Sequence, residues 1–102
     1  MTAAGKITEV KNGRICIIDP DDTLFQSING ALKSMGYETT SAKTGLEGLE
    51  RIRHSFYELI IVAAAMPDMN VAEFLRNMRE VQHDVNIPSS FVIIVAGDDY
   101  KT

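Results

Sequence analysis

The sequence predicts an α/β domain in which helices cover both faces of a parallel sheet. From residue 14 onward, short apolar or β-branched runs alternate with stretches of helical period, which is the pattern of βα units. Two of these runs, residues 59–65 and 91–96, carry no charge, as expected of strands buried on both faces. Right-handed crossovers between four strands and three helices then place helices on each side of the sheet.

Length and composition limit the possible functions. The 102 residues suffice for one domain with a single core, which we expect over residues 14–102 after a flexible N-terminal tail at 1–13. The net charge of −4 and the scattered Lys and Arg argue against a nucleic-acid or membrane surface. There is no apolar segment of membrane-spanning length and no secretory signal, and the lone Cys16 cannot form an internal disulfide. These features indicate a cytoplasmic protein with a buried thiol.

Local signals define the first strand, the first helix and the second strand. The first strand is expected at residues 14–19, and Asp21 or Asp22 is placed to cap the helix that follows. Gly36 is placed to end that helix. Residues 37–42 alternate and are mostly polar, so we expect the second strand at one edge of the sheet. The apolar stripe of the helix consists of Leu24, Ile28, Leu32 and Met35.

The same unit then repeats. Thr44 and Glu47 fit a capping box at the start of a second helix, and Asn70 with Glu73 fits the start of a third. The apolar positions of these helices are Leu46, Leu49 and Ile52, and then Val71, Phe74, Leu75, Met78 and Val81. The strand at 59–65 ends in three alanines. Ligands of open α/β sheets collect beyond the carboxyl ends of the strands, but no side chain here can attack, ionise or bind a metal.

Four stretches in order resemble the receiver domain of bacterial two-component response regulators, namely RICIIDPDD, GYETTSAKTGLEGLE, ELIIVAAAMPDMN and IPSSFVIIVAG. The resemblance covers residues 14–98 and implies a flavodoxin-like (CheY-like) doubly wound sheet of strand order 2-1-3-4, lacking the family's C-terminal helix-strand-helix. In this family an aspartate after the third strand accepts a phosphoryl group from a histidine kinase. Two acidic residues after the first strand hold Mg²⁺, and a Thr or Ser after the fourth strand bonds the phosphoryl oxygens.

Position by position, most of this phosphorylation apparatus is missing. Ala63 stands at the phospho-acceptor position and has no carboxylate to form an acyl phosphate. Asp19 matches the first acidic position, but Pro20 occupies the second, so Asp19, Pro20 and Asp21 make a degenerate acidic site. Val95 replaces the Thr or Ser and lacks its hydroxyl. We therefore expect no catalytic residue, no metal site, no cofactor and no enzymatic activity.

Three other polar residues have plainer explanations. Asp68 lies five residues beyond Ala63, where turn chemistry accounts for it better than a displaced phospho-acceptor. His54 and His83 stand at or near helix ends, where a cationic side chain is a common structural choice. None of the three is expected to take part in phosphotransfer.

Two functions follow from the resemblance. The first is a phosphorylation-independent interaction module of a two-component or phosphorelay system, whose protein partner is an output domain, a kinase or a signalling complex. The second is a conventional phospho-accepting receiver, shortened and inactivated by an Asp to Ala change at position 63. Pro20 and Val95 depart from the family independently of Ala63, which favours natural degeneracy.

The last strand is expected at an open edge, because in the family a fifth strand pairs with it and a fifth helix covers the sheet beside it. Such an edge favours pairing with another chain. We therefore expect a homodimer, or the remainder of a longer protein, to cover Phe91, Val92, Ile93 and Ile94.

Overall fold

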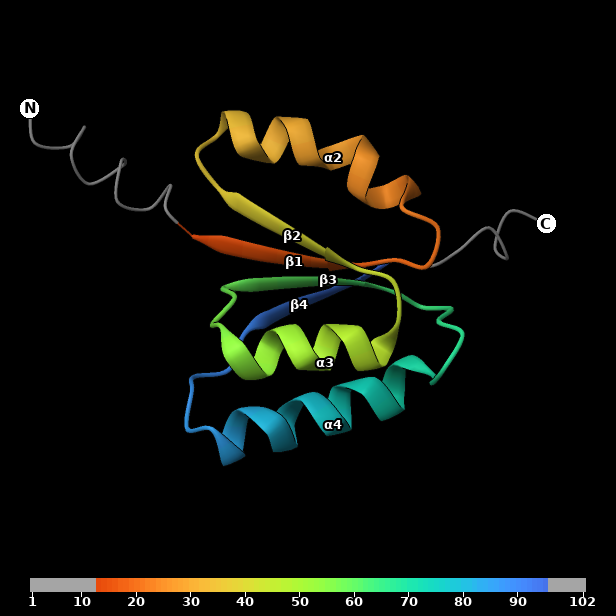
Figure 1. Ribbon diagram of the computed structural model, residues 1–102, viewed down its shortest axis with the longest axis vertical. Helices are drawn as coiled ribbons and strands as arrows, with labels where there is room; N and C mark the ends of the chain where they lie inside the picture. The colour runs from red at the N-terminus through yellow and green to blue at the C-terminus, as the bar shows by residue number, and fades with distance from the viewer. Residues whose placement is uncertain (1–12, 96–102) are drawn as a thin grey trace, which may run out of the picture.

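The computed structural model describes residues 13–95, which form a four-stranded parallel sheet of order β2-β1-β3-β4 with helices on both faces (Figure 1). In chain order the elements are β1 (Arg14–Ile18), α2 (Thr23–Ser34), β2 (Glu38–Ala42), α3 (Gly45–His54), β3 (Leu59–Ala63), α4 (Val71–Asp84) and β4 (Phe91–Val95). One face carries α2, and the other carries α3 and α4. The predicted α/β fold and strand order are confirmed. The predicted tail lies outside the described residues except for Gly13, as does Ala96 of the predicted last strand.

Burial separates the central strands from the edge strands. The central strands β1 and β3 supply fully buried side chains, including Cys16, Ile18 and Ile60. The polar strand β2 lies at one edge, as predicted, and only Ala42 of its five residues is buried. Strand β3 stops at Ala63, two residues earlier than predicted, because Ala64 lies in a bend and Ala65 forms an isolated bridge with Asn70 instead of extending the ladder.

The predicted N-terminal caps of two helices are confirmed. At the start of α3, Thr44 accepts a hydrogen bond from the N–H of Glu47, and at the start of α4, Asn70 accepts one from the N–H of Glu73. Each bond satisfies a donor that the first helical turn leaves without an intrahelical partner. Gly36 follows α2 with a φ of 95°, a left-handed conformation that suits glycine, and so ends the helix as predicted.

The main core lies between the sheet and the two helices α3 and α4. Phe74 of α4 is fully buried there, together with Ile52 of α3 and Val62 of β3. A smaller cluster forms under α2 around Ile15, Ile17 and Ile61, but α2 itself has no fully buried residue. Helix α2 packs over β1 and β2, so the sheet face beside it is less well covered. None of the helices within residues 13–95 is long and apolar enough to cross a bilayer.

Two residues of the predicted apolar stripes are exposed. Leu46 is 65% exposed, because the buried stripe of α3 runs through Gly45, Gly48, Leu49 and Ile52, at the spacing of a helix face. A Cβ on Gly48 would lie 2.5 Å from Cδ1 of Ile18, so the glycine permits the close approach of α3 to the sheet. Met35 follows the end of α2 rather than extending its stripe, and it is 54% exposed.

Candidate functional site

The carboxyl ends of β1, β3 and β4 bring the predicted site residues together. Ala63 ends β3 and is the register partner of Val95, which ends β4. Asp19 follows directly after β1, whose last residue is paired with Val62 of β3. Ala63 and Val95 are both half-buried. The two positions to which the family resemblance assigns an acidic acceptor and a hydroxyl therefore lie side by side and carry a methyl group and a valine side chain.

The Asp19 carboxylate is engaged by the backbone of the segment that follows it. Its Oδ2 accepts a hydrogen bond from the N–H of Leu24 at 2.9 Å, and its Oδ1 accepts a longer one from the N–H of Asp21 at 3.3 Å. Leu24 lies in the first turn of α2, so Asp19 supplies the carboxylate cap of this helix.

The predicted cap at Asp21 or Asp22 is therefore corrected. Asp22 occupies the N-cap position, but it is in the left-handed conformation with a φ of 64° and makes no side-chain capping bond. Asp21 accepts only a 3.3 Å bond from the N–H of Thr23. The left-handed turn at Asp22 brings the start of α2 back over the end of β1, where Asp19 is the closer acceptor.

The exposed carboxylate of Asp21 contacts its own turn, whereas the partly exposed carboxylate of Asp22 reaches Lys43 in the loop before α3. The backbone N–H of Thr23, helped by its hydroxyl, holds the pKa of Asp21 below the ordinary value of 3.8. Asp22 forms an ion pair with Lys43 at 2.8 Å, and hydrogen bonding to that carboxylate raises the pKa of Lys43. Exposed pairs of this kind contribute little stability.

The acidic residues do not fit the Mg²⁺ site that the fold family implies. Magnesium requires an octahedral set of oxygen ligands. Pro20 and Ala63 offer no side-chain oxygen, so Asp19 is the one carboxylate left among the three positions to which the resemblance assigns the acidic site. Within residues 13–95 no three His, Cys, Asp or Glu side chains come together as a metal site.

Asp68 lies in a bend of the β3–α4 loop, as predicted, and it also joins this loop to helix α3. Its two carboxylate oxygens accept the N–H groups of Gly45 and Leu46, each at 2.9 Å. Desolvation acts to raise the pKa of Asp68, but these hydrogen bonds outweigh it and hold the pKa below 3.8. The partners lie more than twenty residues upstream, so no local sequence signal reveals this contact.

Removing the Asp68 carboxylate is expected to destabilise the fold. Asp68→Ala leaves two N–H groups of α3 without their acceptor, and loss of such a cap typically costs about 1 kcal/mol of unfolding free energy. Because folding lowers the pKa of Asp68, the stabilisation by its carboxylate is fully present above the ordinary value of 3.8. It is lost as the pH falls through the lowered pKa of the folded state. Urea denaturation of the variant at pH 7 and pH 3 measures both effects.

Asp84→Ala is the matched control, since Asp84 is an exposed carboxylate in the last turn of α4. A negative charge at a helix C-terminus is unfavourable, so its removal should leave the stability unchanged or slightly higher. If Asp68→Ala and Asp84→Ala lowered the free energy of unfolding equally at pH 7, the capping role of Asp68 would be contradicted.

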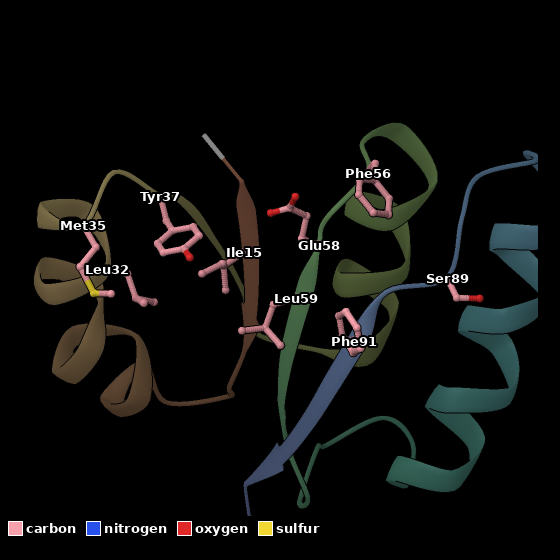
Figure 2. Close-up of a pocket in the computed structure, with 9 residues that line it drawn as sticks. All are labelled: Ile15, Leu32, Met35, Tyr37, Phe56, Glu58, Leu59, Ser89 and Phe91. Carbon is pink, nitrogen blue, oxygen red and sulfur yellow. The ribbon is translucent and has the colours of Figure 1, made fainter. Parts of the chain in front are cut away.

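A pocket of about 710 Å³ lies at the opposite, amino end of the strands (Figure 2). Its lining is mostly apolar and includes Leu32 near the end of α2, Leu59 of β3 and Phe91 of β4. Glu58 is its charged member. The sequence analysis missed this pocket, because its walls come from segments far apart in the chain. It is separate from the carboxyl-end residues where receiver chemistry takes place.

Comparisons with known proteins agree with this geometry. The family model described as the response regulator receiver domain matches residues 15–101. The cell cycle transcriptional regulator CtrA of Caulobacter vibrioides is 30% identical over 84 residues, which are 82% of this chain and 34% of that protein. The chain thus spans about a third of the length of this curated relative.

Solved receiver structures superpose on the chain. A CheY-like receiver domain protein from Methanospirillum hungatei is 30% identical with a TM-score of 0.72, over 84% of this chain and 65% of that one. The beryllofluoride-activated NtrC4 receiver domain dimer is 27% identical with a TM-score of 0.67, over 79% of this chain and 63% of that one. With strand order, helix placement and family match in agreement, this chain belongs to the response regulator receiver family.

Proposed function

We propose that the chain is a receiver-type module of two-component or phosphorelay signalling that acts through protein contacts without accepting a phosphoryl group. The observation that carries the proposal is Ala63, which ends β3 where the family resemblance places the phospho-acceptor. A methyl group has no lone pair with which to attack phosphorus. The module is therefore not a phosphotransfer catalyst.

The neighbours of Ala63 support the same conclusion. Val95, its register partner, has no hydroxyl to bond a phosphoryl oxygen, and Pro20 has no carboxylate for a cation. A phosphorylation switch requires contacts that differ between its two states. In this chain the two carboxylate oxygens of Asp19 accept hydrogen bonds from the N–H groups of Asp21 and Leu24. This contact with the start of α2 forms without a phosphoryl group.

The partner is proposed to be another protein, namely an output domain, a kinase or a signalling complex. CtrA is described as a transcriptional regulator, and one similar receiver structure is described as a dimer, so both regulatory output and self-association have precedents among the relatives. The net charge of −4 disfavours nucleic acid and anionic membrane as partners. A cytoplasmic location is part of the proposal and accords with the buried, unpaired Cys16.

A conventional receiver inactivated by an Asp to Ala change at position 63 is the second candidate. The observation that favours it is the retention of Asp19 at the end of β1, next to the strand that carries Ala63. The codon for residue 63 in the source gene distinguishes the two candidates, since the second requires aspartate there.

Incubation with acetyl phosphate and Mg²⁺ is expected to leave the mass of the intact chain unchanged. The reason is that no carboxylate stands at the end of β3 to form an acyl phosphate. Mass spectrometry checks this, with a phospho-accepting receiver in the same mixture as the positive control. A hydroxylamine-labile phosphate adduct mapped to Asp19, Asp21 or Asp68 would overturn the proposal.

A further inference from the structure

The loop between β3 and α4 has its tip on the start of α3 (Figure 1). An isolated antiparallel bridge joins Ala65 to Asn70 and closes the base of this loop. Asn70 also accepts the N–H of Glu73 in α4, so the base is fixed to the helix that follows. The four residues between the bridge partners, residues 66–69, form the loop tip.

Asp68 makes the polar contact of the loop tip. Its Oδ1 accepts the N–H of Gly45 and its Oδ2 accepts the N–H of Leu46, each at 2.9 Å. The helix dipole favours a carboxylate at this end of a helix, and hydrogen bonds to a charged acceptor are stronger than neutral ones. Desolvation acts to raise the pKa of Asp68, but these bonds hold it below 3.8. The carboxylate is therefore ionised at neutral pH, where the contact has its full strength.

Met69 makes the apolar contact of the loop tip. A Cβ on Gly45 would lie 2.8 Å from both Cγ and Sδ of Met69, so the absence of a side chain on this glycine lets Met69 approach the backbone of α3. Met66 and Met69 are both partly buried and pack against the main core. Hydrogen bonds and packing thus hold the loop tip on the same helix start.

A second contact between carboxyl-end loops is weaker than the one made by Asp68. Lys43, just before α3, pairs with Asp22 of the β1–α2 loop at 2.8 Å, but the two side chains are 55% and 31% exposed. Solvent and salt screen such a pair, and forming it orders two flexible side chains. Asp68 instead bonds two backbone donors that α3 already holds in place.

We propose that the loop tip is a conformational latch, which Asp68 and Met69 close on the start of α3 and which keeps the β3–α4 loop in one conformation. This loop directly follows Ala63, the position to which the family resemblance assigns the phospho-acceptor. Contacts within the chain order the loop, so no phosphoryl group or cation is needed for that. The inference goes beyond the proposed function and does not depend on it, since the latch would close in the same way with an aspartate at position 63.

The latch couples the loop to the outer surface of α3. Leu46 donates its N–H to Asp68, while its side chain is 65% exposed. Beside this side chain lies a groove of about 300 Å³ between α3 and α4, whose lining includes Glu50 and Glu80. Opening the latch removes the acceptor of the Leu46 N–H and lets the first turn of α3 fray. The conformation of the loop and the surface at Leu46 therefore change together.

Backbone order parameters from ¹⁵N relaxation at neutral pH test whether Asp68 closes the latch. In the native chain the amides of Met66, Asp68 and Met69 should have order parameters of about 0.85, the value of rigid backbone. In Asp68→Ala the amides of residues 66, 68 and 69 should fall below about 0.6, the range of flexible segments. The amides of β1 and β3 should keep their native values, which shows that the variant is folded.

Thr44→Ala is the matched control. Thr44 accepts the N–H of Glu47, so this variant removes the other side-chain cap of α3 without touching the loop tip. Its loop tip should keep the native order parameters. A loop tip that stays ordered in Asp68→Ala would overturn the latch. So would a loop tip that loosens as much in Thr44→Ala, because the loop would then follow the general stability of the helix start.

Met69→Ala tests the coupling between the loop and α3, since it removes the apolar contact and leaves the Asp68 carboxylate in place. The N–H of Leu46 should exchange with solvent about fivefold faster or more, because the loop tip then opens more often. Unchanged exchange would show that Asp68 caps α3 without coupling the loop to it, and would overturn the coupling. No phosphodonor enters these measurements, so failure of the latch leaves the proposed function standing. A phosphate adduct on the chain would overturn the proposed function alone.

Discussion

Introducing an aspartate at position 63 is expected to leave the chain without efficient phosphorylation. Ala63→Asp supplies a carboxylate at the end of β3, but Pro20 still offers no metal ligand and Val95 still offers no hydroxyl beside it. Removing one group that stabilises transition-state charge typically slows a reaction by about 10²–10³-fold. We therefore expect phosphorylation by acetyl phosphate with Mg²⁺ to be at least about 10²-fold slower than in a complete receiver.

The rate of mass increase in Ala63→Asp, compared with that of a complete receiver, measures this effect. Ala63→Asn is the matched control, since its side chain has nearly the same shape but no nucleophilic carboxylate. Phosphorylation of Ala63→Asp at the rate of a complete receiver would show that the carboxyl-end site is functional apart from one residue. It would then favour the conventional receiver inactivated at position 63.

Truncating Phe74 is expected to destabilise the domain by about 3–5 kcal/mol, the usual loss for a buried phenylalanine replaced by alanine. Phe74 is fully buried between α4, α3 and the sheet, and its ring lies beside the glycine face of α3 at Gly48. Domains of this kind unfold with about 5–15 kcal/mol in total, so Phe74→Ala should be marginally stable. Urea denaturation measures the change as a lower midpoint with an unchanged slope.

Leu46→Ala is the control for this truncation. Leu46 also belongs to an apolar stripe predicted from the sequence, but it is 65% exposed and should change the stability by less than about 0.5 kcal/mol. If Phe74→Ala and Leu46→Ala lowered the free energy of unfolding by similar amounts, the packing of α3 and α4 on the sheet would be contradicted.

Features governed by neighbouring residues were predictable from the sequence. The alternation of uncharged runs and helical stripes predicted the parallel sheet, and the polar run of β2 predicted its edge position. The caps at Thr44 and Asn70 were also predictable, because a capping side chain bonds an N–H only three residues away. The lack of a carboxylate at position 63 was predictable from the identity of Ala63 alone, since no packing can supply one.

Features that depend on contacts between distant segments were decided by the tertiary structure. Asp68 reaches the start of α3, and Asp19 rather than Asp22 holds the start of α2, because chain direction after each strand sets which acceptor is close. Leu46 is exposed because close helix–sheet packing favours the face of α3 that carries Gly48. The residues of β4 are as apolar as the residues of β3, yet those of β4 are largely exposed and those of β3 are largely buried. Position in the sheet decides which of the two strands is buried, since within residues 13–95 β3 has a neighbouring strand on both sides and β4 has one on a single side.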